Sequence, residues 1–306
     1  MLMLLDTPSL YFRAFYGIPE SMTAPDGMPV NAVRGLIDMV ATLVRTHSPA
    51  ELVATMDADW RPAFRVAAIP TYKAHRVAFG HTEEVPDTLV PQIPVIEQVL
   101  DAVGIARLQS EGYEADDVIG TLTHQARGAV DIVTGDRDLF QLVDDSRPVR
   151  VLYTARGVRN LQVVDEAFVT AKYGIPGRGY ADFATLRGDP SDGLPGVAGV
   201  GEKTAASLIT RFGSLEAILA ALDAGQSDGF PAGCRTKLAA ARDYLRVAPA
   251  VVKVADSAPL PSADLTLPAK PRDPEALVRL ADRYGLDSPL NRLLDALTGG
   301  SLPKSI

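Results

Sequence analysis

Residues Val130-Asp131-Ile132-Val133-Thr134-Gly135-Asp136-Arg137-Asp138 combine a short apolar run, typical of a β-strand, with two carboxylates just beyond its end. A similar arrangement occurs twice earlier in the chain. Residues 2–5 lead into Asp6, and residues 52–56 lead into Asp57. Three predicted strands are therefore each followed, directly or within two residues, by an aspartate.

Segments with helical periodicity alternate with these strands and with two further strand candidates, at residues 105–108 and 149–153. In residues 31–46 one helical face carries Val33, Leu36, Ile37, Val40 and Val44. Helices are also expected at residues 95–103, 115–125 and 137–143. Strands that alternate with helices are typical of βαβ units, so we expect an α/β fold with a central, mostly parallel sheet.

The pattern changes near Asp165, beyond which short helices are broken by glycine and proline. We expect two domains, an α/β core at residues 1–166 and a helical region at residues 167–306. Within the second, residues 256–274 are proline-rich and predict a covering strand or tether. A final amphipathic helix is expected to begin at Leu277.

Composition narrows the class of protein. The chain has 306 residues, 47% of them hydrophobic, enough for about two domains with cores. No apolar stretch approaches the ~18 residues of a membrane span, and no secretory signal is recognisable, so we expect a cytoplasmic protein with no membrane partner. The single cysteine, Cys234, excludes an internal disulfide, and four scattered histidines offer no zinc-ligand spacing. Any metal must be held by oxygen.

Further acids follow the three at the strand ends. Residues 114–117 place Glu114, Asp116 and Asp117 at the start of a helix, and Asp189 and Asp192 lie at a helix end. The carboxyl ends of parallel strands share one edge of a sheet, where ligands bind. The sequence therefore predicts a cluster of carboxylates at that edge.

Taken singly, these acids have an ordinary explanation, because Asp favours helix N-caps and turns; this fits Asp138 and Asp192 best. The explanation fails for the set, since seven or more gathered carboxylates repel one another unless cations neutralise them. Oxygen ligands select Mg²⁺ or Mn²⁺, and two such ions ~3.5–4 Å apart hydrolyse phosphodiesters. The net charge of −8 by itself disfavours a polyanionic partner such as DNA. If the nine predicted ligands form one metal-holding cluster, however, the rest of the chain has 29 acids and 30 bases, and the acid excess belongs to the cluster itself.

Residues 61–82 contain no acid and follow Asp57 closely. Their basic residues are Arg61, Arg65, Lys73, His75, Arg76 and His81. Tyr72 can stack on a base while the neighbouring cations contact phosphate. A solvated loop is the alternative, but the position beside the acids favours contact with nucleic acid.

Residues 196–206, Gly-Val-Ala-Gly-Val-Gly-Glu-Lys-Thr-Ala-Ala, predict a tight turn that opens a helix. Bare backbone amides at a helix start can grip phosphate without reading sequence, and Lys203 and Thr204 add a charge and a hydroxyl. Glu202 stands where a nucleotide-binding loop would have its lysine, so nucleotide binding is rejected. A purely structural helical hairpin is the remaining alternative.

With these motifs, the sequence resembles the 5′-nuclease family, the flap endonucleases and 5′-3′ exonucleases that include the N-terminal nuclease region of bacterial DNA polymerase I. The resemblance extends from Leu4 to about Leu245. It rests on Tyr-Lys-Ala-His-Arg at 72–76, Gly-Tyr-Glu-Ala-Asp-Asp at 112–117, Thr-Gly-Asp-Arg-Asp at 134–138, and Leu-Arg-Gly-Asp at 186–189 through Gly-Glu-Lys-Thr-Ala at 201–205.

The resemblance implies a PIN-like core with a helical arch, followed by a helix-three-turn-helix that holds duplex DNA and a K⁺ ion. It implies two or more Mg²⁺ or Mn²⁺ ions held by Asp6, Asp57, Glu114, Asp116, Asp117, Asp136, Asp138, Asp189 and Asp192. Lys73 and Arg76 match catalytic cations that orient the scissile phosphate. The expected DNA-binding residues are Arg13, Arg61, Arg65, Tyr72, Gly199, Gly201, Lys203 and Thr204.

Three positions depart from the family pattern. Thr7-Pro8 follows Asp6 where glycine is usual, and His75 and Gly193 each replace an asparagine. None of these changes removes a carboxylate or Lys73, so activity is expected.

The sequence therefore predicts a free-standing, monomeric, structure-specific 5′ nuclease of replication and repair. Its expected partner is DNA with a 5′ flap, a nick or a 5′ single-stranded end, with an RNA primer as an open further substrate. One alternative is a non-catalytic DNA-junction-binding protein, which the complete acid set disfavours. The other is a phosphatase that uses Asp57-Ala58-Asp59, which leaves the basic stretch and the glycine turn without a role.

Overall fold

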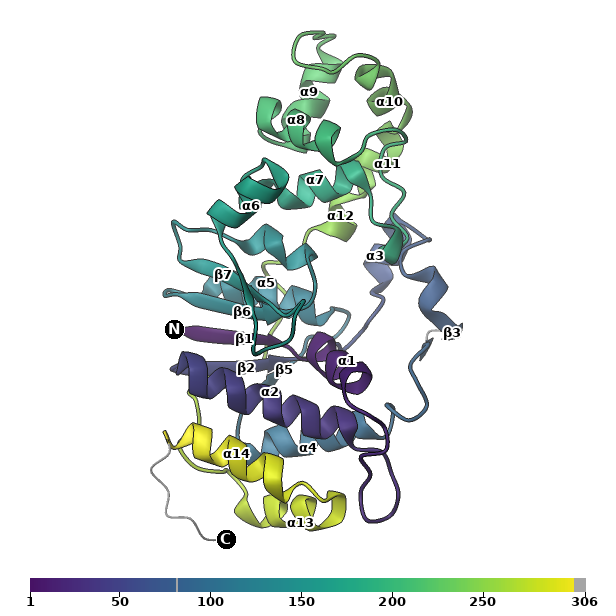
Figure 1. The fold of residues 1–306 in the computed structure, drawn as a ribbon. Helices are drawn as coiled ribbons and strands as arrows, with labels where there is room; N and C mark the ends of the chain where they lie inside the picture. Colours follow the sequence, from purple (N-terminus) through teal and green to yellow (C-terminus); the bar gives the residue numbers. More distant parts are fainter. Residues whose placement is uncertain (81, 300–306) are drawn as a thin grey trace.

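The computed structural model describes residues 1–80 and 82–299, so His81 and the last seven residues lie outside it. At its centre is a six-stranded sheet in the order β5-β2-β1-β6-β7-β8 (Figure 1). The strands are β1 (Leu2–Asp6), β2 (Glu51–Thr55), β5 (Ala106–Leu108), β6 (Val130–Thr134), β7 (Val149–Tyr153) and β8 (Gln162–Val164). Only β8, at one edge, pairs antiparallel. The expected mostly parallel sheet is confirmed.

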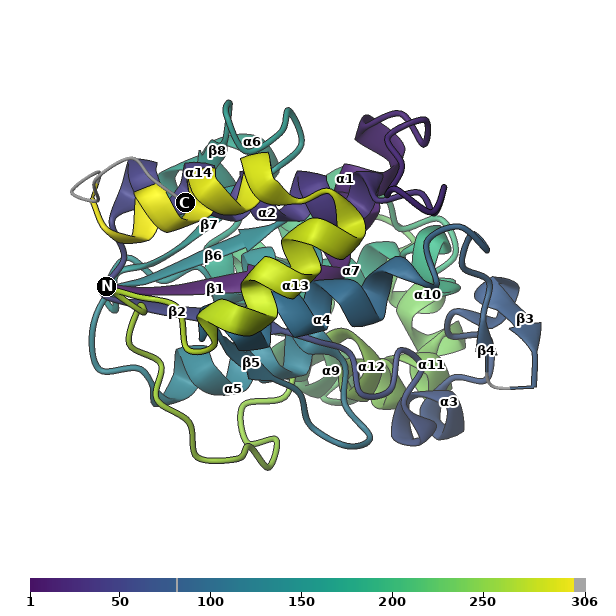
Figure 2. The same ribbon diagram turned by 90° about the horizontal axis from the view of Figure 1, so that it is seen from below.

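The sheet contributes to two hydrophobic cores because successive side chains of a strand point to opposite faces. In β1, Met3 and Leu5 pack into one core, and Leu2 and Leu4 pack into the other. The first core is covered by α1 (Thr7–Gly17), α2 (Asn31–His47), α4 (Gln92–Val103), α13 (Pro274–Tyr284) and α14 (Asp287–Leu297), the side seen in Figure 2. The second is covered by α5 (Ala115–Gln125) and the helical domain.

Most elements of the core domain have the expected bounds. β6, β7 and α5 agree with the prediction, whereas α4 begins three residues early, where the Gln92 side chain accepts the Ala32 amide hydrogen bond at 2.8 Å. Residues 137–143, expected as an α-helix, form a 3₁₀ helix instead, η2 (Asp138–Leu142). Helix α1 was not predicted, because an acid followed by proline suits a turn as well as the helix start that Asp6 caps.

The helical domain follows β8 and packs directly onto the sheet. Its elements are α6 (Glu166–Tyr173), η3 (Gly177–Gly179), α7 (Tyr180–Arg187), η4 (Pro190–Asp192), α8 (Glu202–Phe212), α9 (Leu215–Asp223), α10 (Cys234–Ala240), α11 (Arg242–Val247) and α12 (Pro249–Val252). Tyr180 of α7 contacts Phe140 of η2 with ring centroids 5.5 Å apart, so both domains share one interior. Within the described residues, no single helix could cross a membrane by length and hydropathy; α8 and α9 pass that test only as a pair bent by 80°.

The chain returns to the core domain after α12. Leu52 donates a backbone hydrogen bond to Leu265, and Leu267 donates one to Ala50, so the proline-rich segment covers the start of β2 as expected. Helices α13 and α14 then pack on α4 and α2. The sequence assigned all of residues 167–306 to the helical region, whereas the structure places this last part with the core, because its apolar faces complete the core beside α2.

The segment between β2 and α4 projects from the core beside the helical domain (Figure 1). In its described residues it contains α3 (Ala63–Ala68), one 3₁₀ turn η1 (Ala74–Arg76), and a hairpin of β3 (Val77–Phe79) and β4 (Thr82–Glu83). The helical arch that the resemblance implies is therefore represented here by short helices and a small hairpin. We call residues 61–76 the arch base.

Helices α1 and α2 cross closely at Gly35. A Cβ atom at this position would lie 2.6 Å from both the Ala14 Cβ and the Ile18 Cδ1. We predict that Gly35→Val lowers the free energy of unfolding by ~1–3 kcal/mol, because the added carbons overpack the crossing. Chemical denaturation measures the change. Gly17→Val is the matched control, since nothing lies within 4 Å of its Cβ position; equal losses in both variants would contradict the packing argument.

Candidate active site

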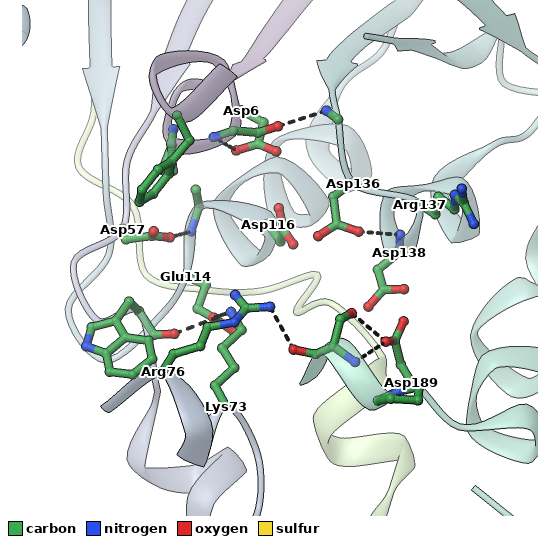
Figure 3. A pocket seen from close by; sticks show the side chains of 18 of the residues that line it. Asp6, Asp57, Lys73, Arg76, Glu114, Asp116, Asp136, Arg137, Asp138 and Asp189 are labelled. Atoms are coloured by element: carbon green, nitrogen blue, oxygen red, sulfur yellow. Dashed lines mark hydrogen bonds and ion pairs between the residues drawn. The ribbon is translucent and has the colours of Figure 1, made fainter. Parts of the chain in front are cut away.

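The predicted acids at the strand ends meet at the carboxyl edge of the sheet. Asp6 is the last residue of β1, and Asp57 and Asp136 each lie two residues beyond a neighbouring strand, β2 or β6. Because these three strands are adjacent and parallel, their ends open onto the same cavity, of about 770 Å³ (Figure 3). The convergence predicted from the sequence is present.

The cavity lies between the sheet edge, the arch base and the helical domain. Seven of the nine predicted ligands line it: Asp6, Asp57, Glu114, Asp116, Asp136, Asp138 and Asp189. Four cations line the same cavity: Lys73, Arg76, Arg137 and Arg187. Negative and positive side chains from both domains and the arch base therefore surround one space, a composition suited to metal ions and a phosphate together.

Hydrogen bonds hold several carboxylates in place. Asp6 accepts from the Ser9 amide at 3.2 Å and from the Thr134 hydroxyl at 2.5 Å. Asp57 accepts from the amide of Ala115 at 2.7 Å. Asp136 accepts from the Asp138 amide at 2.8 Å, and Asp189 from the amide and hydroxyl of Ser191 at 2.8 and 2.5 Å. These acids are thus held by residues at a strand end, such as Thr134, and by residues near the starts of helical elements, such as Ser9, Ala115 and Ser191.

Burial and repulsion from neighbouring carboxylates raise the pKa values of four cavity carboxyls, those of Asp6, Asp57, Asp116 and Asp138. Burial, with added repulsion from Asp136, raises the pKa of Asp6 to about 7, although the Thr134 hydrogen bond opposes this rise. Burial also raises the pKa of Asp116 and of Asp138 well above the usual range, with nearby carboxylates adding to the effect. The pKa of Asp57 is raised by burial and then by Glu114. A bound cation would relieve these costs, because it favours the charged form of each carboxyl.

The cavity fits divalent metal ions by its chemistry. Its carboxylate ligands are all oxygen donors, the ligands preferred by Mg²⁺ and Mn²⁺. Across residues 1–80 and 82–299, no three Asp, Glu, His or Cys side chains are already close enough to enclose an ion. The carboxylates thus share a space without forming a finished coordination sphere, and bound ions would have to draw them inward.

Glu114 and Asp117 have different roles although three residues separate them. Glu114 lines the cavity, where its carboxylate is held by Arg65, by Lys73 and by the Tyr72 hydroxyl, the last at 2.6 Å. Asp117 does not line the cavity. Its buried carboxylate accepts two hydrogen bonds from Arg65, at 2.7 and 2.8 Å. The expectation that Asp117 is a metal ligand does not fit this placement, because Arg65 already neutralises it.

Asp192 and the two predicted catalytic cations lie at one side of the cavity. Arg76 forms an ion pair with Asp192 at 2.9 Å, and the Lys73 amide donates to the Asp192 carbonyl at 3.0 Å. Asp192 itself is not among the residues that line the cavity. Burial alone would lower the pKa of Lys73, but Glu114, Tyr72 and Asp192 together outweigh burial and raise this pKa well above the usual range. Lys73 and Arg76 are therefore charged groups, each paired with a carboxylate.

The predicted DNA-binding residues of the N-terminal half differ in accessibility. Arg13 lines a groove that adjoins the cavity, together with Phe12 and Tyr16. Arg61 is partly buried and donates to the carbonyl oxygens of Tyr72 and Pro70. Arg65 and Tyr72 are only 2% and 3% exposed. The expectations that Tyr72 stacks on a base and that Arg65 contacts phosphate therefore do not fit this structure.

The glycine turn before α8 has the geometry expected of an anion site. Gly199 has a φ of 74°, and Gly201 precedes α8 without any side chain capping its first amides. Gly201 and Lys203 are exposed, and Thr204 is half-buried. Lys237 of α10, which belongs to none of the sequence motifs, donates from its Nζ to the Gly199 carbonyl at 2.9 Å.

Other lining residues were also missed from the sequence. Trp60, Glu83 and Glu202 line the cavity, as do Arg137 and Arg187. Arg137 lies between two predicted acids and Arg187 lies two residues before Asp189, so a search for cations within the acidic motifs would have found them. Nothing in the sequence around Trp60 distinguishes it from a packing residue.

Comparison with known proteins gives the family. The model for "5'-3' exonuclease, N-terminal resolvase-like domain" matches residues 1–174, and that for "5'-3' exonuclease, C-terminal SAM fold" matches residues 175–275. A 5'-3' exonuclease of Streptomyces coelicolor is 61% identical over 301 residues, covering 97% of this chain and all of that protein. DNA polymerase I of Mycobacterium bovis is 40% identical over 99% of this chain, which corresponds to 32% of the polymerase.

Solved structures agree on the fold. The D15 protein of T5, co-crystallised with metal ions, superimposes with a TM-score of 0.64 at 17% identity, covering 97% of this chain and 99% of that one. Human GEN1 in complex with Holliday junction DNA superimposes with a TM-score of 0.63 at 16% identity, covering 96% of this chain and 72% of that one. With both halves of the chain matched in order and the acids gathered at one sheet edge, the protein belongs to the 5'-3' exonuclease family.

Proposed function

We propose that this member of the 5'-3' exonuclease family is a structure-specific 5′ nuclease that acts with divalent metal ions on DNA carrying a 5′ flap, a nick or a 5′ single-stranded end. It works in the cytoplasm as a monomer, in replication and repair. The observation that carries the proposal is the cavity that nine carboxylates, seven of them predicted ligands, and four cations line together, between the sheet edge and the helical domain.

The residues that would hold the ions are the lining carboxylates, with Asp116 and Asp136 nearest the centre of the set in Figure 3. Bound Mg²⁺ or Mn²⁺ would supply Lewis-acid activation of water and would offset negative charge on the reacting phosphate. Lys73 and Arg76 extend from the arch base toward the same space. They would orient the scissile phosphate and stabilise its developing charge.

The exposed turn at Gly199–Thr204 would hold the duplex part of the substrate. Its bare amides and Lys203 provide phosphate contacts that are independent of sequence. The potassium ion belongs to this part of the proposal, because backbone carbonyl oxygens at a turn are suitable ligands for a hard cation. The Gly199 carbonyl itself already accepts from Lys237. Duplex binding at the turn would place the 5′ end of one strand in the carboxylate cavity.

Removing a central carboxylate tests the catalytic part of the proposal. We predict that Asp136→Ala lowers the cleavage rate of a 5′-flap DNA with Mg²⁺ by ~10²-fold or more, because the metal ions lose a ligand. DNA binding measured in EDTA should persist. Asp282→Ala, an exposed acid on α13, is the control. Wild-type turnover in Asp136→Ala, or wild-type cleavage in EDTA, would contradict metal-dependent catalysis and favour the junction-binding alternative.

The raised pKa of Asp6 predicts how stability depends on pH without metal. A carboxyl with a pKa of about 7 in the folded state, against 3.8 as its ordinary value, binds more protons folded than unfolded between these pH values. Stability in EDTA should therefore fall as pH rises from about 4 to about 7. Mn²⁺ should reverse the loss above pH 7, because it binds the ionised folded form.

Thermal denaturation at pH 5, 6, 7 and 8, with EDTA and with Mn²⁺, measures this dependence. Asp6→Asn should make the EDTA profile less steep, because the amide does not titrate, whereas the raised pKa values of Asp57, Asp116 and Asp138 still contribute. If the melting temperature of the wild type in EDTA rises between pH 5 and 7, the carboxyls of the folded protein do not have the raised pKa values on which this prediction depends.

The glycine turn predicts how binding responds to salt. Lys203→Ala should weaken binding of a duplex in EDTA at every sequence tested, and it should reduce the slope of log K against log salt by about 1. Fluorescence anisotropy at several KCl concentrations measures both quantities. Lys270→Ala, an exposed lysine in the segment before α13, is the matched control. An unchanged slope in Lys203→Ala would leave the turn with only its structural role.

A further inference from the structure

The chain leaves the helical domain through residues 251–255. Three side chains of the core domain and arch base, Arg65, Gln141 and Asp117, form hydrogen bonds with the backbone of this segment, and we call this set of contacts the clasp. Arg65 donates from its Nε to the Val251 carbonyl at 3.0 Å. Gln141 donates to the Val252 carbonyl at 3.0 Å and accepts from the Val254 amide at 3.2 Å. Asp117 accepts from the Ala255 amide at 2.8 Å.

Arg65 and Asp117 also join each other inside the protein. Two hydrogen bonds, of 2.8 and 2.7 Å, connect the guanidinium to both carboxylate oxygens. Neither residue is more than 2% exposed. A bidentate pair of this kind fixes distance and angle together, which a single ion pair does not. The pair therefore holds the exit segment at a defined distance and angle from α5.

The same pair reaches the carboxylate cavity through Glu114. Arg65 donates a further hydrogen bond to Glu114, and the Asp117 carboxylate accepts from the Glu114 amide at 3.1 Å. Glu114 in turn holds Lys73 of the arch base. One buried pair therefore connects a cavity-lining carboxylate, a predicted catalytic cation and the exit of the helical domain.

The exit segment at residues 251–255 is closely packed and cannot easily shift relative to α5. A Cβ atom at Gly120 of α5 would lie 2.5 Å from the Ala255 carbonyl oxygen, so α5 and the exit segment are in close contact. On the other side, the Thr71 hydroxyl donates to the Gly193 carbonyl at 2.8 Å, and with the contacts of Lys73 and Arg76 to Asp192 it joins the arch base to the helical domain there as well. The helical domain is held against the cavity from both sides.

We infer that Arg65 and Asp117 are positioning residues that set the orientation of the helical domain relative to the carboxylate cavity, and that this orientation selects which phosphodiester is cut. Neither residue contacts DNA or metal in this role. The inference rests on the proposed function and deepens it. If the turn at Gly199–Thr204 binds the duplex, its distance from the cavity determines which phosphate of the strand lies at the site of cleavage.

Asp117→Asn and Arg65→Met test the inference on a 5′-flap DNA labelled at its 5′ end. Wild type should cut at one dominant phosphodiester. Both variants should spread cleavage over neighbouring positions and lose ~10- to 100-fold in kcat, since small misplacements of reacting groups have effects of this size. The Kd for the same DNA in EDTA should remain within about twofold, because no DNA contact is removed.

Metal binding separates a positioning role from a ligand role. Asp117→Asn should bind as many Mn²⁺ ions as wild type in a titration followed by electron paramagnetic resonance, whereas Asp116→Asn, which changes a cavity-lining carboxylate, should bind fewer or bind more weakly. Loss of a Mn²⁺ ion in Asp117→Asn would assign Asp117 as a ligand and overturn its positioning role.

A second Arg–Asp pair provides the matched control. Arg150 holds the buried Asp131 through two hydrogen bonds, of 2.7 and 3.1 Å, between β6 and β7 and away from the cavity. Arg150→Met and Asp131→Asn should lower stability and leave the cleavage position unchanged. A spread of positions in these variants as well would show that general destabilisation, and not the clasp, is responsible.

Gln141→Leu keeps the test valid if the Arg65 and Asp117 variants fail to fold. It breaks the same clasp from η2 without removing a charge, and Gln141 does not line the cavity. Spread cleavage with wild-type Mn²⁺ binding supports the inference. If wild type cuts at one position and Gln141→Leu keeps that position, the inference is wrong although the proposed function stands; if wild type does not cut at all, the proposed function itself fails.

Arg65 allows one further discrimination. If Arg65→Met weakens DNA binding, lowers the salt slope by about 1 and leaves the cleavage position unchanged, then Arg65 contacts phosphate directly and the positioning role is overturned.

Discussion

The electrostatic cost of gathering carboxylates at one sheet edge is the constraint on which the rest of this structure depends. Asp6, Asp57 and Asp136 come together because three adjacent parallel strands end there. Burial raises the free energy of the ionised forms of Asp6 and Asp57, as their raised pKa values indicate. The protein offsets part of this cost with cations from the arch base and the helical domain, and divalent ions would offset the remainder.

This constraint explains why the two domains cannot be understood separately. The core domain supplies the acids at the strand ends, the helical domain supplies Asp189 and Arg187, and the arch base supplies Lys73 and Arg76. Since the cations and acids come from three parts of the chain, their relative orientation must be held firmly. The buried Arg65–Asp117 pair and its contacts with residues 251–255 provide such a hold, because they join all three parts through hydrogen bonds inside the protein.

The place of a residue in the cavity can be predicted from the sequence where it depends on the end of a strand. It cannot be predicted where it depends on which side chains become buried together. Asp6 and Asp136 were identified correctly as members of one cluster, because the ends of parallel strands meet wherever the strands are adjacent. Asp117 and Arg65 carry the same charges as true cavity residues and lie in the same motifs. Their side chains nevertheless point to each other, because α3 packs against α12 and thereby places Arg65 within hydrogen-bond distance of Asp117 in α5.

The sequence by itself determined the strand and helix pattern, the family and the chemistry of the cavity, because these follow from local periodicity and from the types of residue at strand ends. The tertiary structure alone decided that α13 and α14 complete the core domain, that Tyr72 is covered, and that Lys237 reaches the glycine turn. These outcomes depend on contacts between residues far apart in the chain. Such contacts are set by how apolar faces pack against one another, and no local pattern records them.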